Sequence, residues 1–456
     1  MPALSLTEYV LSGKVTDEAT KQPLLGATVF ADNTTIGTAT DNNGIFHLRL
    51  PNGGYSIVIT FTGYQTETKR VTTADAGNSQ IVIEIKQKEK SLEEFVVKST
   101  SEVADGLEKY GEFFMENFIG KTVNSKQCYI KNKEVFKFFY YRRAKRLKIL
   151  ATAPLEIVND ALGYTIKYEL DSFVHEYNTQ VSLYTGYPLF QEMQSADPAQ
   201  LEKWNAARKE AYNGSILHFM RSVYQKKLKE EGFEIQFIIK KNDRETAIPL
   251  KDFYGAINYK LDDSSNTVEI LPNQRDMAVI YKNEGSSTLY VDANPDASSK
   301  FQSSVVSFLP GEPLDIEQNG FYFDQNDITI TGYWAWEKVG DMVPYDFDFT
   351  GKAMPANKEE VKTLPVVKPI TEQTKESGSL LTNVTWKMEE SRVIDANNIF
   401  YYKRNGQQNT INFDNDLYKF NAANTGIYFF NGQEYNFSWN SLVAEHEQLA
   451  MIILSP

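Results

Sequence analysis

The sequence has a single cysteine, Cys128, among its 456 residues. One cysteine cannot form an intrachain disulfide, so packing rather than cross-linking must stabilise the fold in any compartment. Cys128 also lacks a local catalytic signature, and we expect it to be a buried structural thiol. The chain is long enough for two or three domains, and its 41% hydrophobic and 13% aromatic residues can supply large cores.

Histidine is also scarce, and its spacing excludes the common zinc peptidase motifs. A zinc carboxypeptidase needs His-x-x-Glu and a distant histidine, because imidazoles and a carboxylate must converge on one ion. Three positions after the four histidines stand Leu50, Asn178, Arg221 and Leu449. There is no His-Glu-x-x-His, no Gly-x-Ser-x-Gly and no complete P-loop. The sequence therefore offers no catalytic residues, and we do not expect zinc carboxypeptidase activity.

Positive charge is in deficit, since the net charge is −13 and the pI is about 5.1. A dedicated nucleic-acid or anionic-membrane binder needs a basic surface to neutralise phosphates, so this balance opposes both classes. The most basic stretch is "KFFYYRRAKRLKIL" at 137–150. Its alternation is typical of a strand with one wet basic face.

Long apolar runs are absent too. No stretch approaches the roughly 20 residues that span a bilayer, so we expect no transmembrane segment. The opening "MPALSLTEYV" has neither a positive start nor a long apolar stretch, so this sequence shows no complete signal peptide. "PALSLT" resembles the tail of a cut or mis-started signal, which hints at export.

The first hundred residues contain a series of short strands between turns. The segments are bounded by Gly, Pro or Asn and read "YVLSGKVTD", "GATVFAD", "IGTAT", "IFHLRL", "YSIVITF" and "IVIEI". "DNNG" at 41–44 predicts a hairpin loop in which Gly44 takes a positive φ. In "YSIVITF", Ile57, Ile59 and Phe61 point to one side, as on one face of a β-sandwich.

This segment resembles the carboxypeptidase-regulatory-like domain, a transthyretin-like β-sandwich common at the N-termini of Bacteroidota surface and outer-membrane proteins. The matching positions are Gly13, Pro23, Gly26, Ala27, Val29, Gly37, Thr38, Asp41, Gly44, Phe46, Leu48, Tyr55, Phe61, Gly63 and Tyr64. The resemblance implies an extracytoplasmic location. It implies no catalysis, because the module is an accessory fold in that family.

The central part mixes helices and strands. Apolar residues at 103, 107, 110, 114 and 118 predict an amphipathic helix. Strand-like segments follow from about 134 to 184, and then a helical pair at 198–213 and 215–232. We expect Ser215 to cap the second helix and Gly232 to end it. His218 and Arg221 then fall on or toward its solvent face.

Four segments of this region resemble the body of a group of uncharacterised Bacteroidota proteins that carry the same N-terminal module. They are "APLEIVNDALGYTIKYEL", "YTGYPLFQEM", "WNAARKEAYNGSILHFMRSVY" and "GYWAWEKVGDMVPYDF". The resemblance runs from about residue 99 to 350. No reaction is attached to the group, so the resemblance implies a family but no activity.

The stretch "TGYWAWEKVGDMVPYDFDF" at 331–349 concentrates aromatic and acidic residues. Alternation over 328–337 predicts a half-buried strand with Trp334 and Trp336 in the core. If the pair were exposed instead, it could stack on sugar rings. The candidate ligand-binding residues are Tyr333, Trp334, Trp336, His218 and Arg221.

The same stretch contains a candidate metal site. Calcium favours clusters of carboxylate oxygens, but the spacing of the aspartates here matches no EF-hand loop. The candidate ligands are Asp341, Asp346 and Asp348, with Asp324 and Asp327 upstream. Calcium is the one cofactor that the sequence suggests, and no other is expected.

The C-terminal part begins with a change of composition. Residues 352–379 are rich in Lys, Glu, Pro and Thr, which predicts a linker. In the β-rich unit that follows, "LTNVTW" and "YYKRNGQQNTINFDNDLYKFNAANTGIY" resemble the lipocalin-like domains of Bacteroidota secreted proteins. We identify about six strands, whereas a ligand-enclosing up-and-down barrel needs about eight. The barrel is therefore expected to be partial.

We therefore predict a mainly β, multidomain chain with some α structure. Its parts are an N-terminal transthyretin-like β-sandwich at 1–98, a mixed α+β central domain at 99–351, a linker at 352–379 and an antiparallel, partly lipocalin-like β unit at 380–456. The predicted function is non-enzymatic binding or assembly outside the cytoplasm, at the outer membrane or cell surface of a Bacteroidota bacterium. The expected partners are an outer-membrane or cell-surface protein and a glycan, with no nucleic acid.

Two alternatives stay open. The first is a carboxylate-dependent hydrolase, carbohydrate-active enzymes included, in the central domain, which requires two acidic side chains facing each other across a pocket. The second is a small-ligand carrier built on the C-terminal unit, which requires a closed apolar cavity.

Overall fold

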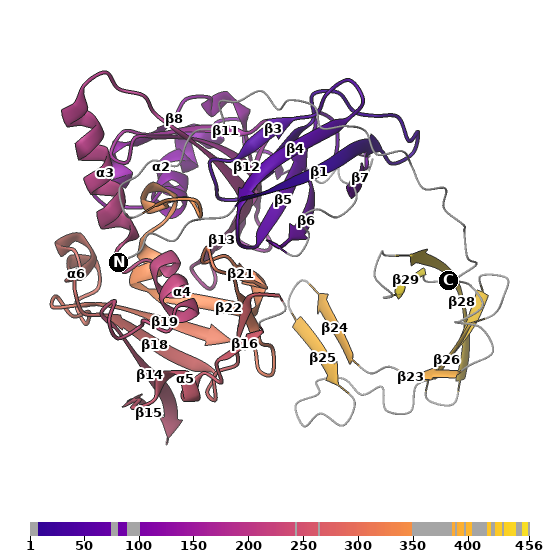
Figure 1. Cartoon of the computed structure of the whole chain (residues 1–456). Helices are drawn as coiled ribbons and strands as arrows, with labels where there is room; N and C mark the ends of the chain where they lie inside the picture. Colours follow the sequence, from indigo (N-terminus) through magenta and orange to yellow (C-terminus); the bar gives the residue numbers. More distant parts are fainter. Residues whose placement is uncertain are drawn as a thin grey trace. The chain divides into compact units, whose positions relative to one another are not determined.

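The computed structural model describes residues 8–73, 81–88, 101–241, 244–262 and 265–348, and seven strands between residues 385 and 454. The chain divides into two compact units, Met1–Glu359 and Glu360–Pro456. Figure 1 shows that most described elements are strands, and the described helices lie between Gly106 and Trp336. The prediction of a mainly β, multidomain chain with some α structure is confirmed.

The N-terminal part of the first unit is a β-sandwich. One sheet has the order β4-β1-β7, with β1 (Glu8–Asp17), β4 (Ile45–Pro51) and β7 (Ile81–Ile85). The other has the order β3-β2-β5-β6, with β2 (Thr28–Ala31), β3 (Gly37–Ala39), β5 (Tyr55–Thr60) and β6 (Glu67–Val71). The two sheets bury one shared core, which includes Val15, Phe46, Leu48, Ile57 and Ile59.

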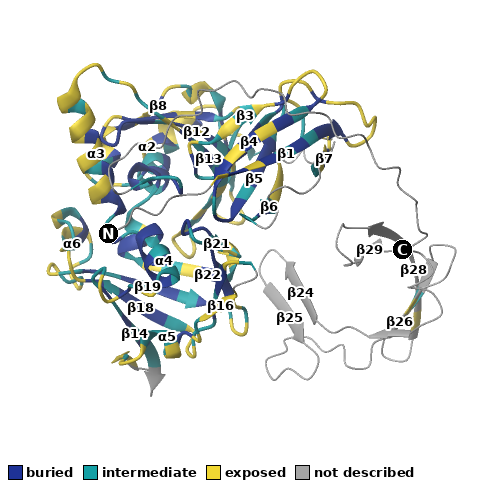
Figure 2. Ribbon diagram, viewed as in Figure 1, coloured by how far each residue is buried: buried dark blue, intermediate teal, exposed yellow. Residues whose placement is uncertain are grey.

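The six strands predicted for this part are present, and Gly44 has the predicted positive φ of 74°. β6 is an additional strand. β5 also departs from the prediction of one apolar face, because Val58 is buried as well as Ile57 and Ile59. Phe30, which pairs with Val58 on the neighbouring strand β2, is buried too. The second sheet is therefore covered on both faces at β5, and Figure 2 shows buried residues along this strand.

The central part begins with a six-stranded sheet around the long strand β12. Along one edge β12 pairs with β13 over nearly its whole length. The other edge is shared by β11 and β10, outside which lie β8 and β9. The strands are β8 (Cys128–Ile130), β9 (Phe136–Tyr141), β10 (Arg146–Ala151), β11 (Leu155–Asn159), β12 (Tyr164–Glu176) and β13 (Val181–Glu192).

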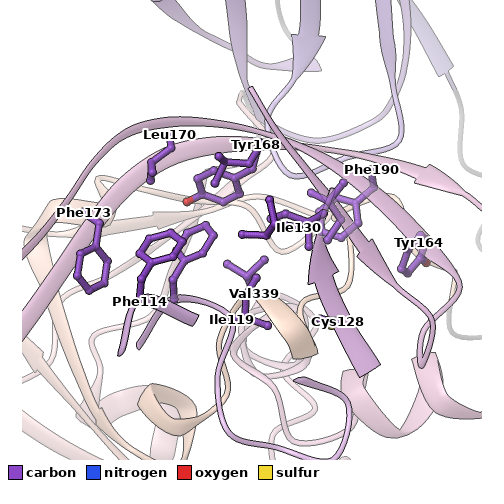
Figure 3. Packing of buried hydrophobic residues seen from close by; sticks show 14 of the residues in the cluster. Phe114, Ile119, Cys128, Ile130, Tyr164, Tyr168, Leu170, Phe173, Phe190 and Val339 are labelled. Carbon is purple, nitrogen blue, oxygen red and sulfur yellow. The ribbon is translucent and has the colours of Figure 1, made fainter. Parts of the chain in front are cut away.

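Two helices pack with this sheet, α2 (Gly106–Phe118) and α3 (Pro198–Tyr212). The predicted amphipathic helix is present as α2, which begins at Gly106 and not at Val103. Its Phe114 ring lies 5.2 Å from that of Phe173, and its Phe118 ring lies 4.9 Å from that of Tyr168. Figure 3 shows Phe114, Tyr168 and Phe173 among the packed side chains of this core.

The basic stretch 137–150 is a hairpin and not the single strand that we expected. β9 and β10 pair antiparallel from Phe136 opposite Ala151 to Tyr141 opposite Arg146. Lys145 takes a positive φ of 50° in the turn between them. The alternation of apolar residues continues on both sides of the turn, so the sequence pattern did not reveal the break.

The rest of the central part contains two further sheets. One has the order β15-β14-β18-β19-β22, with β14 (Phe233–Lys241), β15 (Arg244–Pro249), β18 (Asp276–Tyr281), β19 (Gln302–Phe308) and β22 (Ile328–Gly332). The other has the order β16-β17-β20-β21, with β16 (Lys260–Asp262), β17 (Thr267–Ile270), β20 (Leu314–Ile316) and β21 (Tyr322–Phe323).

The remaining described helices of the central part are α4 (Ile216–Tyr224), α5 (Phe253–Ala256), α6 (Thr288–Ala293) and α7 (Tyr333–Trp336). The described 3₁₀ turns are η2 (Ser125–Gln127), η3 (Lys133–Val135), η4 (Gln325–Asp327) and η5 (Val339–Asp341).

Helix α4 is shorter than predicted. Ser215 caps it, because its hydroxyl accepts a hydrogen bond from the His218 N–H at 3.2 Å. The helix ends at Tyr224 and not near Gly232. Lys226 has a positive φ of 55°, and the Lys227 N–H reaches back to the Ser222 carbonyl at 2.8 Å. A residue with positive φ, followed by a hydrogen bond to the carbonyl five residues earlier, is a common way for a helix to end.

In the second unit the described strands form a five-stranded sheet of order β23-β26-β27-β28-β29 and a hairpin of β24 and β25. They are β23 (Thr385–Lys387), β24 (Glu390–Asp395), β25 (Asn398–Lys403), β26 (Leu417–Phe420), β27 (Thr425–Phe430), β28 (Gln433–Val443) and β29 (Leu449–Leu454). These described strands do not close into a barrel, and the lipocalin-like relationship stays a prediction. The predicted linker at 352–379 lies outside the described residues.

Candidate functional site

The turn between β2 and β3, Asp32–Thr35, reaches from the sandwich to strand β13. The Asn33 N–H donates to the Pro188 carbonyl at 2.9 Å. The Phe190 N–H donates back to the Thr34 carbonyl at 2.8 Å. These backbone bonds make the turn an extension of the central sheet at the end of β13.

The same turn is held on its other side by the segment after η5. The Tyr345 N–H donates to the Asn33 carbonyl at 2.7 Å. The Thr35 N–H donates to the Asp346 carboxylate at 3.0 Å, and the Thr35 hydroxyl donates to the same group. The turn therefore lies between two central segments, and the sandwich is a fixed part of the first unit.

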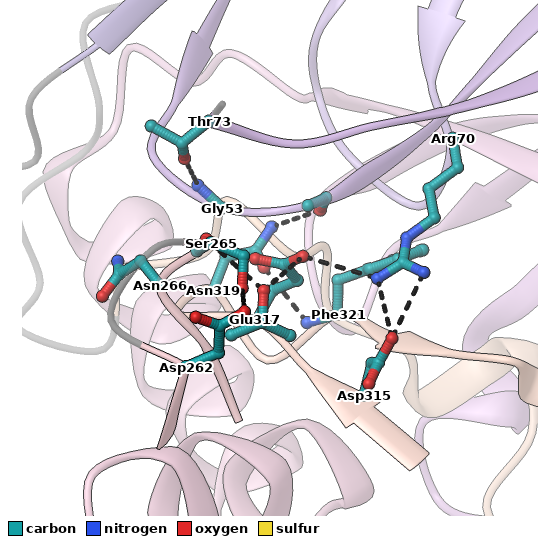
Figure 4. A network of polar contacts seen from close by, with 12 residues as sticks. Gly53, Arg70, Thr73, Asp262, Ser265, Asn266, Asp315, Glu317, Asn319 and Phe321 are labelled. Atoms are coloured by element: carbon teal, nitrogen blue, oxygen red, sulfur yellow. Dashed lines mark hydrogen bonds and ion pairs between the residues drawn. The ribbon is translucent and has the colours of Figure 1, made fainter. Parts of the chain in front are cut away.

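A second turn of the sandwich docks on the hairpin of β20 and β21, as Figure 4 shows. The Asn319 side-chain amide donates to the Gly54 carbonyl at 3.0 Å. A Cβ added at Gly53 would lie 2.5 Å from Asn319 Cγ, and one added at Gly54 would lie 2.5 Å from Glu317 Cγ. Gly53 also has a positive φ of 143°. Only glycine allows so close an approach of backbone to side chain.

Arg70 of β6 completes this contact. Its guanidinium lies 3.4 Å from Asp315 Oδ2, 3.6 Å from Glu317 Oε1 and 4.3 Å from the centre of the Phe323 ring. The Glu317 side chain is only 3% exposed. Burial raises the pKa of Glu317 to about 7, although the charge of Arg70 opposes this shift.

We expect the first unit to lose stability as the pH rises from about 4.5 to about 7. An unfolded glutamate ionises near pH 4.3, whereas the folded Glu317 keeps its proton up to a pKa of about 7. Within this window the unfolded state binds fewer protons, so rising pH favours unfolding. Arg70, Asp315 and Thr267 face Glu317, and none of them reverses this sign.

Thermal unfolding measured at several pH values checks this expectation. Glu317→Gln removes the titration while keeping the shape of the side chain, so the unfolding midpoint should depend less on pH than in the unaltered protein. Glu245→Gln is the matched control, because Glu245 is exposed on β15. Equal pH profiles for Glu317→Gln and the unaltered protein would contradict the expectation.

A cavity of about 700 Å³ lies where the sandwich meets both halves of the central part. The β2–β3 turn and β5 contribute one wall, β12 and β13 a second, and the segments 321–326 and 334–345 a third. Its volume is in the range of small-molecule binding sites. Its polar lining residues are Asp32, Asn33, Ser56, Tyr168, Asp171, Tyr184, Thr185, Tyr187, Ser215, Tyr322, Asp324, Gln325, Asn326, Glu337, Lys338, Asp341 and Tyr345.

Burial shifts the acids of the cavity toward their neutral forms. It raises the pKa of Asp32 to about 7 and that of Asp341 to about 6, and hydrogen bonds from Thr122 and Asn124 limit the shift at Asp341. The pKa of Glu337 is also raised, by burial first and then by the charge of Asp341. Burial lowers the pKa of Lys338. The cavity therefore disfavours charge that is not matched by a partner.

Two acceptor atoms of the lining residues are buried and unsatisfied. Asp32 Oδ1 and Asn33 Oδ1 have no hydrogen-bond partner within the described part of the chain. Buried polar atoms in folded proteins nearly always have a partner. Both residues belong to the turn that connects the sandwich to the cavity, so the unsatisfied atoms occur at the junction.

The sandwich has a known counterpart. Residues 11–97 match the CarboxypepD_reg-like domain. The regulatory-like domain is thus present, as the sequence predicted, and it is built into the first unit through the two turns. No curated protein matches the chain. No helix in the described residues is long and apolar enough to cross a membrane.

Two solved structures are similar to this chain at low level. A 9R-lipoxygenase from Cyanothece PCC8801 is 8% identical with a TM-score of 0.13 over 48% of this chain and 48% of the lipoxygenase, so the chain spans about half of that protein. A protein of unknown function from Bacteroides fragilis NCTC 9343 is 10% identical with a TM-score of 0.14 over 68% of this chain and 94% of that one. TM-scores this low carry no argument about fold or function.

His218 and Arg221 do not face solvent, and that prediction is wrong. His218 is buried, accepts from the Gly214 N–H at 3.1 Å and faces Glu231 at 3.4 Å. Arg221 donates to the carbonyls of Asn319, Phe347 and Tyr345 at 3.0, 3.1 and 2.9 Å. Both side chains hold the fold together, and neither lines the cavity.

The predicted strand through Trp334 and Trp336 is also wrong beyond Gly332. Gly332 takes a positive φ of 81°, and residues 333–336 form the short helix α7. Trp334 is buried in the core, as predicted, and its indole N–H donates to the Gly214 carbonyl at 2.6 Å. Trp334 also borders the cavity. Trp336 is half-buried, with its ring 5.6 Å from that of Tyr290.

Tyr333, the remaining ligand candidate, is buried with its ring 4.9 Å from that of Tyr290. No group of three or more His, Cys, Asp or Glu in the described ranges could hold a metal ion. Asp341 accepts from Thr122 and Asn124 at 2.9 and 3.0 Å, and Asp346 binds Thr35. Asp348 is half-buried. The structure therefore does not bring these three aspartates together around one ion.

Sequence reasoning missed most of the cavity. Asp32 and Asn33 stand in a turn, and Tyr168 and Tyr187 stand in strands, without any spacing that links them. The useful sign was the aromatic and acidic stretch 331–349, since Trp334, Glu337, Lys338, Asp341 and Tyr345 all line the cavity.

Proposed function

We propose that the chain is a non-enzymatic binding protein that works outside the cytoplasm, at the outer membrane or cell surface of a Bacteroidota bacterium. Its ligand occupies the cavity between the regulatory-like domain and the central part. The observation that carries this proposal is the site itself, a cavity of about 700 Å³ whose wall includes the Glu337 carboxyl group and five tyrosine side chains.

The way the cavity is built supports this function. Its three walls come from segments far apart in the sequence, and backbone hydrogen bonds fix the β2–β3 turn to both central walls. Aromatic and polar side chains in a fixed concave site are typical of small-molecule recognition. The regulatory-like domain then contributes to the binding site itself, in addition to its accessory role in the related family.

The proposed location rests on the resemblance to Bacteroidota surface proteins. An outer-membrane or cell-surface protein is the partner that such a location implies, and a glycan remains a ligand class compatible with aromatic side chains. Affinity purification from detergent-solubilised envelopes, with partners identified by mass spectrometry, tests the assembly role. Recovery of the chain without any stoichiometric partner would remove that part of the proposal.

Native mass spectrometry of the same preparation tests the cavity. Thr185→Trp should abolish the retention of a bound small molecule, because Thr185 is an exposed lining residue and the larger ring would fill the space. Leu183→Trp is the matched control on the same face of β13, since Leu183 is 65% exposed and does not line the cavity. Equal retention by both variants, or no retained molecule in the unaltered protein, would count against the site.

A carboxylate-dependent hydrolase is the second candidate. The observation in its favour is that Glu337 and Asp341 line the cavity and both have raised pKa values, which is how acids are prepared for general acid catalysis. Against it, Asp341 is already engaged by Thr122 and Asn124. Hydrolysis of a glycan panel that Glu337→Gln abolishes would establish this candidate, and no hydrolysis by the unaltered protein would remove it.

A further inference from the structure

The walls of the cavity carry many more acids than bases. Five carboxylic acids line it, Asp32, Asp171, Asp324, Glu337 and Asp341, against the single lysine Lys338. None of these five forms an ion pair with another described residue. Carboxylates enclosed in protein are normally paired with a cation. Asp171 is exposed, and Asp324 and Asp341 accept hydrogen bonds from neighbouring groups. The missing counter-charge therefore concerns Asp32 and Glu337, whose pKa values burial raises.

The raised pKa values agree with that reading. Burial is the first cause of the shift at Asp32, Asp171 and Glu337, and the cationic contribution among them is that of Lys88 to Asp171. A bound cation would supply the positive charge that the protein lacks and would favour the ionised carboxylates. The chain as a whole also attracts cations, with its net charge of −13.

Aromatic rings provide the second requirement of a cation site. Tyr168, Tyr184, Tyr187, Tyr322 and Tyr345 all line the cavity. Ring faces attract ammonium groups, and aromatic side chains around a cation are the usual way to recognise alkylated ammonium ligands. The Nζ atom of Lys338 already lies 5.9 Å from the centre of the Tyr184 ring. This wall of the cavity therefore already contains one contact between a cation and an aromatic ring.

We propose that the cavity binds a small organic cation, which is held by Asp32 and Glu337 and contacts the surrounding tyrosine rings. This inference rests on the proposed function, because it names the ligand class of the same site. A neutral saccharide would also use aromatic rings and carboxyl groups. It would leave Asp32 and Glu337, which form no ion pair with another described residue, without a counter-charge, so the cation accounts for more of the wall.

Isothermal titration with choline tests the inference, because a quaternary ammonium keeps its charge at every pH. The paired probe is dimethylbutanol, its uncharged carbon isostere, which should bind at least about tenfold more weakly. With the pKa of Asp32 at about 7, choline affinity should fall about tenfold from pH 8 to pH 6, as Asp32 becomes protonated. The groups facing Asp32 are Tyr168, Tyr187 and Tyr345, and their raised pKa values keep them neutral over this range.

Variants separate the site from general electrostatic attraction. Asp32→Asn should lower choline affinity at pH 8 at least about tenfold and reduce its pH dependence, and Glu337→Gln should lower the affinity independently. Asp296→Asn is the matched control, because it removes the same charge at an exposed position outside the cavity. It should leave affinity unchanged.

Three results would overturn the inference. They are equal binding of choline and dimethylbutanol, equal loss in Asp296→Asn and Asp32→Asn, and binding of a maltose or cellobiose probe without choline binding. None of these touches the proposed function, whose own test is retention of a molecule that Thr185→Trp abolishes. A retained molecule combined with no choline binding would therefore reject the cation and keep the binding site.

Discussion

Replacing Arg221 with alanine should destabilise the first unit by about 3–5 kcal/mol. The guanidinium is the common donor to three backbone carbonyls, those of Asn319, Tyr345 and Phe347. Alanine would leave these part-buried carbonyls without their charged donor, and acceptors shielded from water without a partner carry a penalty. Urea unfolding followed by fluorescence would measure the change in the free energy of unfolding.

Two further substitutions isolate the cause. Arg221→Lys keeps the charge but offers one compact ammonium in place of a planar fork, so it should recover little of the lost stability. Arg143→Ala removes an exposed arginine from the β9–β10 turn and should change stability by less than about 0.5 kcal/mol. Full recovery in Arg221→Lys would show that charge matters and that the three hydrogen bonds do not.

The same variant should weaken ligand binding, because Arg221 holds the carbonyl of a cavity residue. Tyr345 lines the cavity, and its backbone is fixed between Arg221 on one side and Asn33 on the other. A residue outside the cavity thus positions one inside it. In Arg221→Ala, the affinity of any cavity ligand should fall together with stability.

Local patterns were enough to predict much of the fold. In the regulatory-like domain, alternation and turn glycines identified six strands, because each strand has one apolar face and ends at residues with special backbone preferences. β6 was missed, since Glu67, Thr68 and Lys69 are all exposed and give no apolar alternation. Helix α2 was found because its apolar residues follow a helical period over four turns or so.

The failures occur where a distant segment covers a polar face. Helical spacing predicted that His218 and Arg221 lie on the polar side of α4. In an isolated helix this side would face solvent. In the fold, Tyr212, Phe233 and Tyr281 surround His218, while the carbonyls near Asn319 and Tyr345 receive Arg221. The covering partners are more than 90 residues away for Arg221, so no local pattern contains them.

The short helix α7 failed for a different reason. The alternation over 328–337 was real, but Gly332 has a backbone conformation that ends the strand. The Trp334 N–H then donates to the Ser304 hydroxyl at 3.0 Å, which satisfies a free donor at the start of the new helix. Gly332 occupies a position of the pattern that should be apolar in a strand, and this was the sign of the break. A prediction based on alternation alone overlooked it.

The cavity could not be predicted, because it depends on how the regulatory-like domain docks. A freely tethered sandwich would leave Asp32 and Asn33 in an ordinary exposed turn. Docking places them beside tyrosines of β12 and β13 and beside the stretch 331–349. The ligand site and the domain contact therefore form together, and a substitution that breaks the contact should also destroy the site.

Gly54→Ala is the substitution that we expect to release the regulatory-like domain. The new methyl group would lie 2.5 Å from Glu317 Cγ, so Glu317 must move and the neighbouring hydrogen bond from Asn319 to the Gly54 carbonyl is lost. Overpacking and the lost bond together weaken docking by about 2–4 kcal/mol. That corresponds to a change in the docking equilibrium of roughly 30- to 800-fold.

A protease site inserted within residues 89–100 allows docking to be measured in the full chain. After cleavage, the unaltered regulatory-like domain should co-elute with the remainder in size-exclusion chromatography, whereas the Gly54→Ala domain should elute separately. Gly63→Ala is the matched control, because Gly63 has a positive φ of 86° but nothing within 4 Å of an added Cβ. It carries the backbone strain of an alanine without the steric contact.

The Gly63→Ala control shows whether Gly54 is required for its close approach to Glu317. If Gly63→Ala stays docked and Gly54→Ala separates, the close approach to Glu317 is the requirement, and the domain is held by shape at this turn. If both separate, strain within the sandwich is sufficient and the contact has no special role. Co-elution of the cleaved Gly54→Ala chain would mean that the β2–β3 turn, with Asp346 and β13, holds the domain without help from this contact.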